Sequence, residues 1–156
     1  MGSEFYFHDG DITEHDKTHN PCYHLILLVK DNTGYANIVK LTSAAWCKGR
    51  YVKPRINWEL LEKHHEGLIC CSACLGGEVL QHLLKNDYEG AKAVAKRFKD
   101  LFGEDYYIEL QDHGLEEQKR TNPDLIKIAQ ELDIEMVITN DSHYLNLEDA
   151  DMHDTL

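Results

Sequence analysis

The sequence predicts an α/β fold built on a parallel sheet or barrel. Short apolar runs alternate along the chain with amphipathic stretches of helical spacing, and short polar loops join them. Polar residues gather directly after the apolar runs, where ligand sites lie in such folds. The 156 residues, 42% of them hydrophobic, are enough for one domain with one core.

The first half of the chain alternates strand and helix signals. The run YHLILLV, at Tyr23–Val29, has the continuous apolar character of a strand buried on both faces. The polar stretch His8–Pro21 is expected to form a loop. Strands are expected at Glu4–Phe7, Tyr23–Val29 and Gly67–Cys71, and helices at Tyr35–Trp46 and Trp58–His65.

The second half continues the alternation. Helices are expected on both sides of Asn86-Asp87, and the second of them, Glu89–Phe102, is amphipathic and closed by Gly103. Tyr106–Leu110 alternates like a strand. Because Asn can cap a helix and Pro suits its first turn, Asn122-Pro123-Asp124 predicts a helix running to about Leu132. A last strand is expected at Met136–Thr139.

Charge and hydropathy restrict the function. The formal charge of -12 argues against a broad duplex-binding face, because such faces concentrate Lys and Arg against phosphates. No stretch approaches the roughly 18 consecutive apolar residues of a membrane span. The start of the chain lacks the basic and apolar regions of a signal peptide. The sequence therefore predicts a cytoplasmic protein without a membrane partner.

Five cysteines are expected to be free thiols, because the cell interior is reducing. Cys71 and Cys74 have CxxC spacing, which is found in zinc knuckles and in redox pairs. No second CxxC and no nearby HxxxH completes a structural zinc site. Motifs of hydrolase elbows, P-loops and dinucleotide-binding folds are absent as well.

The strongest local signal for chemistry is Asp141-x-His143, directly after an apolar strand. A carboxylate and an imidazole two residues apart in extended backbone can both reach one divalent ion. The alternative is a capping Asp beside an exposed His. Three further residues, His24, Cys74 and Glu4, also lie near strand ends and could be metal ligands. The alternative for His24 is a core histidine, for Cys74 an inert buried thiol, and for Glu4 an ordinary surface carboxylate.

The remaining histidines are assigned no metal-binding role. Those in the early loop and at the end of the second helix are expected to be exposed polar residues; they are His8, His15, His19, His64 and His65. His113 and His153 lie near element ends and are either surface residues or partners of ligands.

Several segments together resemble the PHP (polymerase and histidinol phosphatase) domain of bacterial DNA polymerase III alpha subunits. The most specific is GLICCSACLGGE, at Gly67–Glu78. The others are Gly2–Tyr6, Tyr23–Leu25 with Asn32–Tyr35, Phe102–Gln111 and Thr139–Tyr144. Their order and spacing match the family over nearly the whole chain. Gly-Ser-Glu-Phe is also what a cloning junction encodes, but the continuation Tyr6-Phe7 fits the family and favours a native start.

The resemblance implies a fold and a site. The family fold is a distorted (β/α)7 TIM-like barrel, of which this chain would form a part, and its strand ends bind up to three metal ions. By resemblance the metal ligands here would be Glu4, His24, Cys74, Asp141 and His143. A mixed His, Asp and Cys set suits Zn or Mn better than Mg, which prefers oxygen ligands alone.

The resemblance also implies a function and exposes departures. The family's opening His-x-His motif and its later Thr-Asp-His motif do not occur upstream of Glu4, so residues 1–156 are expected to be a PHP domain fragment without the polymerase core. The parent would be a DNA-directed DNA polymerase acting in DNA replication. Its partners would be the rest of the alpha chain, the other replicase subunits and, through the parent, DNA.

Three hypotheses for the site remain open. The PHP site could be a metal-dependent phosphoesterase of the 3'-5' exonuclease type, or a structural platform, and the fragment alone is expected to be inactive. A free-standing phosphatase related to histidinol phosphatase is the alternative, against which the segment Gly67–Glu78 argues. The third is a thiol or zinc module using Cys70, Cys71 and Cys74.

Overall fold

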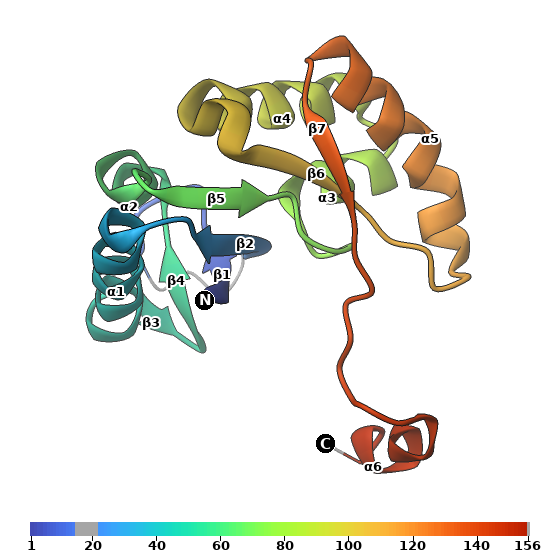
Figure 1. Ribbon diagram of the computed structural model, residues 1–156, viewed down its shortest axis with the longest axis horizontal. Coiled ribbons are helices and arrows are strands. Elements are labelled where there is room, and N and C mark those ends of the chain that lie inside the picture. Colours follow the sequence, from blue (N-terminus) through green and yellow to red (C-terminus); the bar gives the residue numbers. More distant parts are fainter. Residues whose placement is uncertain (15–21, 156) are drawn as a thin grey trace.

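The computed structural model describes residues 1–14 and 22–155 and places seven strands in one open sheet. The order across the sheet is β3-β4-β1-β2-β5-β6-β7 (Figure 1). The strands are β1 (Gly2–Phe7), β2 (Tyr23–Val29), β3 (Arg50–Tyr51), β4 (Lys53–Ile56), β5 (Leu68–Cys71), β6 (Tyr106–Leu110) and β7 (Glu135–Ile138). The mixed α/β class is thus confirmed, whereas barrel closure is not seen in the described part of the chain.

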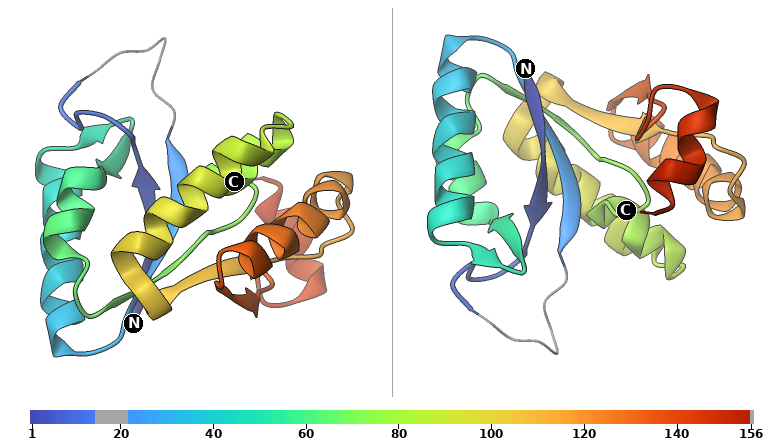
Figure 2. Two further views of the ribbon diagram at one scale, coloured as in Figure 1. Left: turned by 90° about the horizontal axis from the view of Figure 1, so that it is seen from above. Right: turned by 90° about the horizontal axis from the view of Figure 1, so that it is seen from below.

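Helices flank this sheet. α1 and α2 lie beside β3, β4 and β5, whereas α3, α4 and α5 lie around β6 and β7 (Figures 1 and 2). The helices are α1 (Asn32–Cys47), α2 (Trp58–His64), α3 (Glu78–Leu84), α4 (Tyr88–Phe102), α5 (Glu116–Glu131) and α6 (Ala150–His153), with short 3-10 turns at Gly103–Asp105 and Leu147–Asp149. After β7 the chain runs away from the sheet and ends in α6 (Figure 1).

The sheet is mixed rather than parallel, which corrects the prediction. Only β1–β4, β5–β6 and β6–β7 pair in parallel, while β1–β2, β2–β5 and β3–β4 pair antiparallel. A parallel neighbour needs a long crossover, usually helical, and no helix was expected between the first two predicted strands. β1 and β2 therefore lie side by side in opposite directions, with Tyr6 opposite His24.

Capping side chains define where three of the helices begin. Asp31 accepts a hydrogen bond from the backbone N–H of Gly34 at 2.9 Å and starts α1. Asn57 and Asp87 act in the same way at α2 and α4. Gly103 ends α4 with a positive φ of 59°, which glycine adopts without a Cβ clash.

The start of α5 differs from the prediction. The helix begins at Glu116, six residues before Asn122, and Pro123 lies inside it. The first turns stay helical although Pro123 removes one backbone donor, because their polar side chains have partners. Gln118 accepts from the backbone N–H of His113 at 2.8 Å, and Thr121 donates to the carbonyl of Glu117.

Two further expectations need correction. The strands β3 and β4 were not predicted, because the segment Arg50–Ile56 is mostly polar and turns at Val52, whose φ is 59°. His8, expected to be exposed, is buried. His15 and His19 lie outside the described residues, as does part of the loop expected at His8–Pro21. None of the helices in the described ranges is long and apolar enough to cross a membrane.

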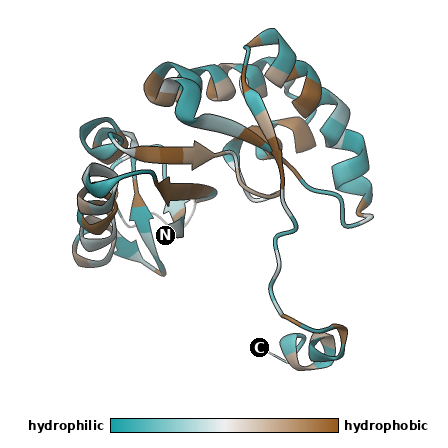
Figure 3. Cartoon of the chain, in the orientation of Figure 1, coloured by the Kyte–Doolittle hydropathy of each residue, from teal (hydrophilic) through white to brown (hydrophobic). Residues whose placement is uncertain are grey.

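An aromatic cluster fills the core between the sheet and α4. Phe98 stacks on Tyr106 with ring centroids 5.5 Å apart, and contacts Phe7 and Trp58 edge-on. The apolar strands β2 and β5 pass beside this cluster and stand out as the brown strands in Figure 3. Burial of these rings joins the two groups of helices through one continuous core.

Tyr106→Phe is expected to raise the free energy of unfolding by about 1 kcal/mol. The Tyr106 hydroxyl is buried without a hydrogen-bond partner among the described residues, and such a group costs roughly 1 to 3 kcal/mol. Removing it keeps the stacked ring. Urea unfolding of both chains measures the change; a loss of stability of 1 kcal/mol or more would contradict it. Tyr107→Phe on the same strand is the control.

Candidate metal centre

Three of the predicted ligands meet on neighbouring elements. Glu4 lies in β1, His24 begins β2, and Cys74 lies in the loop after β5. The Nδ1 atom of His24 is 3.4 Å from Oε1 of Glu4 and 3.5 Å from Sγ of Cys74. Tyr6 packs edge-on against the His24 ring at 5.3 Å and fixes one side of it.

The loop Ser72–Gly77 is held against β2 by its glycines. The backbone N–H of His24 donates to the carbonyl of Gly76 at 2.9 Å, and Gly77 forms a parallel bridge with His24. A Cβ on Gly76 would press into the His24 ring. Cys74 can therefore reach His24 because Gly76 has no side chain.

Asp141 and His143 form a second pair in the segment after β7. His143 Nε2 lies 3.6 Å from Asp141 Oδ1, and His153 from α6 packs beside the His143 ring at 5.5 Å. Asp141 has a positive φ of 45°, unusual for a residue with a side chain. The charge of Asp141 acts on Cys74 and on Glu109, so it lies within electrostatic reach of the first group.

Burial and negative charge shape the protonation of the thiol. Burial raises the pKa of Cys74, and the nearby carboxylates of Asp141 and Glu4 raise it further, whereas a backbone hydrogen bond from Gly76 lowers it. In this negative surrounding the neutral thiol is favoured. A cation bound among these carboxylates would reverse the balance and favour the thiolate.

Glu109 is the functional candidate that the sequence did not reveal. It ends in the space between the loop after β5 and the segment after β7, and it is buried although it is a carboxylate. Burial raises the pKa of Glu109, hydrogen bonds from Thr139 and Ala73 lower it, and the charges of Asp141 and Glu4 raise it again. An acidic residue on a buried strand is the signal that could have indicated it.

A second carboxyl group lies near His24. Glu78 opens α3 and lines a small cavity together with His24 and Tyr106. Burial, with a contribution from Asp9, raises the pKa of Glu78 to about 7, although Arg97 and His82 oppose the shift. Glu78 therefore changes charge near neutral pH.

The chemical types of the candidate ligands suit a metal ion better than the distances between them do. Carboxylate, imidazole and thiolate ligands together are typical of Zn²⁺ sites, and the carboxylates also suit Mn²⁺. In the described ranges, however, no three His, Cys, Asp or Glu side chains are arranged to hold one ion. Glu4 and Cys74 both contact the same nitrogen of His24, which is a hydrogen-bonding arrangement rather than convergence on a shared point.

The CxxC interpretation receives no support from the geometry. Cys70 and Cys71 are buried in β5, away from solvent. Burial raises the pKa of Cys71 to about 12, with a contribution from Glu109. Without a bound metal, a thiol that stays protonated is a poor redox nucleophile at neutral pH.

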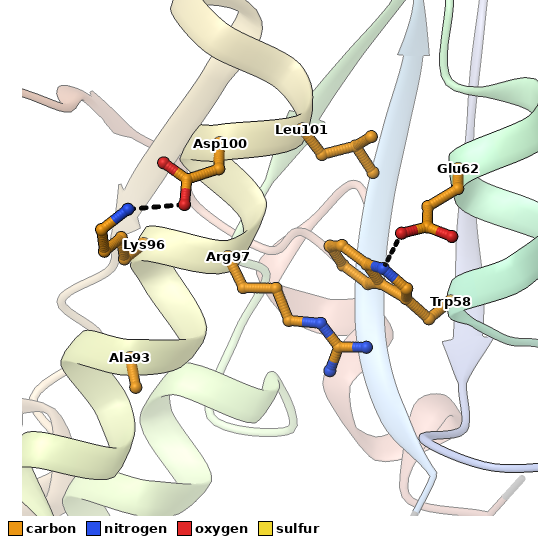
Figure 4. A pocket seen from close by; sticks show the side chains of 7 residues that line it. All are labelled: Trp58, Glu62, Ala93, Lys96, Arg97, Asp100 and Leu101. Atoms are coloured by element: carbon orange, nitrogen blue, oxygen red, sulfur yellow. Dashed lines mark hydrogen bonds and ion pairs between the residues drawn. The ribbon is translucent and has the colours of Figure 1, made fainter.

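The open hollow between α2 and α4 is separate from this cluster. It has a volume of about 450 Å³, and its wall includes Trp58, Lys96 and Arg97 (Figure 4). Arg97 lies 3.8 Å above the Trp58 ring, Trp58 donates to Glu62, and Lys96 pairs with Asp100. Because none of the predicted ligands lines it, the hollow adds nothing to the metal centre.

An open α/β sheet in which Glu4, His24 and Cys74 meet beside β1 and β2 defines a class of fold with a candidate metal site next to the sheet. The family model described as the PHP domain matches residues 1–113. The chain therefore belongs to the PHP domain family. The match includes Met1–Phe5, most of which lies in β1.

Three similar proteins from different bacteria carry the same name. The chain is 45% identical over 161 residues to DNA polymerase III subunit alpha of Deinococcus radiodurans, covering 100% of this chain and 12% of that protein. It is 48% identical to the protein of that name from Borreliella burgdorferi, over 86% of this chain and 12% of the relative. It is 42% identical to the protein of that name from Aquifex aeolicus, over 100% of this chain and 14% of the relative. The chain thus spans about one eighth of the length of these relatives.

Proposed function

We propose that this chain is the PHP part of a replicative DNA polymerase III alpha subunit, whose whole is a DNA-directed DNA polymerase. The observation that carries the proposal is the similarity at 45% identity over the full chain to a protein of that name. The same similarity argues against a free-standing phosphatase. The proposed partners are the rest of the alpha chain, the other replicase subunits and, through them, DNA.

We also propose that Glu4, His24, Cys74, Asp141 and His143 bind divalent metal ions, Zn²⁺ or Mn²⁺ rather than Mg²⁺. The contacts of His24 with Glu4 and Cys74 support this, as do the electrostatic links from Asp141 to Cys74. Bound ions would lower the pKa of a bound water molecule and would stabilise the negative charge on phosphate oxygens. The side chains of this chain would exchange their mutual hydrogen bonds for metal contacts.

The reaction proposed for such a site in the parent protein is phosphoester hydrolysis of the 3'-5' exonuclease type. Within this chain His24 holds the Cys74 loop through its backbone and orients its ring between β1 and that loop. Glu4 and Asp141 make the surroundings negative, which favours a cation and disfavours a free phosphate. The chain alone is expected to be inactive. The complete domain of the parent protein is proposed to be a distorted (β/α)7 barrel.

Metal content after dialysis tests the site. Plasma mass spectrometry is expected to find near-stoichiometric Zn or Mn in the chain and at least tenfold less in an Asp141→Ala/His143→Ala variant, because each lost ligand removes bonding and geometric control. His82→Ala/Asp87→Asn is a matched control: it removes another His–Asp pair while Asn keeps the cap of α4. Absence of metal from the unmodified chain would defeat the metal proposal and leave a structural role.

A further inference from the structure

We infer that Glu109 is a positioning residue that fixes the loop carrying Cys74 relative to the segment carrying Asp141. The inference rests on the proposed metal site, because the two segments supply its candidate ligands from different strand ends. Glu109 stands on β6, which lies in the sheet between β5 and β7. The carboxylate therefore starts from the strand between the two segments that it joins.

Each oxygen of the carboxylate holds one segment. Oε2 accepts a hydrogen bond from the backbone N–H of Ala73 at 2.8 Å. Oε1 accepts from the hydroxyl of Thr139 at 2.9 Å. Ala73 directly precedes Cys74, and Thr139 lies two residues before Asp141. A single side chain thus sets the separation of the two candidate ligands.

Further hydrogen bonds reinforce each half of this link. On one side the backbone N–H of Glu109 donates to the Ser72 hydroxyl at 2.9 Å. On the other side Gln111 donates to the Thr139 hydroxyl at 3.2 Å, and Nε2 of His113 lies 2.7 Å from the carbonyl of Asn140. The N–H of Thr139 also donates to the carbonyl of Leu110. In each of these bonds one partner lies at or just after the end of β6, so one strand end organises both segments.

Backbone strain indicates what the link does. Ala73 has a positive φ of 66°, and Asp141 has a positive φ of 45°, both in a region that residues with side chains rarely adopt. Such conformations persist only where the surroundings hold them. The charge-assisted hydrogen bond from Ala73 to a buried carboxylate is a strong interaction of that kind. It turns the Cys74 side of the loop toward His24, which its thiol contacts.

A carboxylate of this length accepts from both donors. A glutamine has one uncharged acceptor oxygen, so the Ala73 N–H and the Thr139 hydroxyl cannot both donate to separate oxygens, and a Thr139 hydroxyl beside its NH₂ group would have to turn and accept. At Thr139, serine keeps the hydroxyl, whereas valine keeps the shape and loses it. These substitutions therefore separate the hydrogen bonds from packing.

The first test measures amide hydrogen exchange at Ala73 in the metal-free chain. In Glu109→Gln the amide hydrogen of Ala73 is expected to exchange with solvent at least about tenfold faster, because a hydrogen bond to a charged group is lost. Amides in the centre of α4 serve as the internal control and are expected to keep their rates. Unchanged exchange at Ala73 would overturn the inference, whatever the metal content.

The second test reads the site through Co²⁺, whose thiolate charge-transfer absorption reports coordination by Cys74. Glu109→Gln and Thr139→Val are expected to weaken Co²⁺ binding about 10-fold to 100-fold, and Thr139→Ser is expected to bind as the unmodified chain does. Equal binding by all four chains would overturn the inference. If the unmodified chain binds no Co²⁺, the proposed metal site fails and Ala73 exchange alone decides the role of Glu109. Should Glu109→Gln not fold, the Thr139 pair decides it.

Discussion

Arg55→Met is expected to lower the free energy of unfolding by about 3 to 5 kcal/mol. Arg55 is fully buried in β4, and among the described residues its guanidinium donates to the backbone carbonyls of Gly49 at 3.1 Å, Ile12 at 2.6 Å and Glu14 at 2.9 Å. Without it, the carbonyl of Ile12 loses its buried donor and that of Gly49 keeps only the backbone N–H of residue 55. A hydrogen bond to a charged group contributes roughly 1.5 to 3 kcal/mol. The segment after β1 would also lose two of its hydrogen bonds to β4.

Urea unfolding followed by circular dichroism measures this loss. Arg50→Met is the matched control, because Arg50 is exposed on the adjacent strand and contacts only the Trp46 ring among its recorded partners, at 5.4 Å. Such an exposed cation–π contact is worth about 0.5 to 1 kcal/mol. Similar losses for the two variants would show that the buried guanidinium has no special role. Arg55→Lys is expected to recover little, since an ammonium lacks the planar set of donors.

Elements with strong hydrophobic patterns could be predicted from the sequence. The bounds expected at Tyr23–Val29 and Glu89–Phe102 agree within one residue with the observed β2 and α4. They could be predicted because the spacing of apolar residues shows which side chains are buried. The hairpin β3–β4 could not be predicted in this way. Its second strand, β4 (KPRI), is half charged. It is stabilised by hydrogen bonds from Arg55 to carbonyls distant in the sequence, which no local pattern encodes.

The directions of the strands were also beyond local patterns. Periodicity indicates that a segment is a strand, but the neighbour that it pairs with depends on the whole chain path. The start of α5 was misplaced for a related reason. A capping signal at Asn122 was outweighed by the tertiary context: the side-chain NH₂ of Asn122, which lies inside α5, donates to the carbonyl of Gln111.

The site could be predicted in its residue types and not in its arrangement. The structure brings Glu4 and Cys74 to His24, and places Asp141 with His143, as strand-end positions suggested. Their role as ligands stays a prediction. Glu109 was missed because its importance comes from two hydrogen bonds to residues 36 and 30 positions away in the sequence. Only the folded chain reveals such a link.

Two glycines fix the approach of α1 to the start of β5. Gly34 is the third residue of α1, and a Cβ there would overlap the backbone carbonyl of Gly67. Gly67 has a positive φ of 74°, and a Cβ on it would in turn overlap Asp31 and Gly34. The carbonyl of Gly67 also accepts from the backbone N–H of Lys30 at 2.9 Å, so it cannot turn away freely.

Gly34→Ala is accordingly expected to destabilise the chain by about 3 kcal/mol, since backbone overlap forces α1 and β5 apart. Helix propensity alone predicts the opposite sign, a gain of about 1 kcal/mol. Gly90→Ala is the matched control: Gly90 is the third residue of α4, but the atoms near its Cβ belong to the side chains of Asp87 and His82, which can move. Thermal unfolding of both variants decides the matter. If Gly34→Ala is as stable as Gly90→Ala, the close approach of the two backbones is not what holds α1 in place.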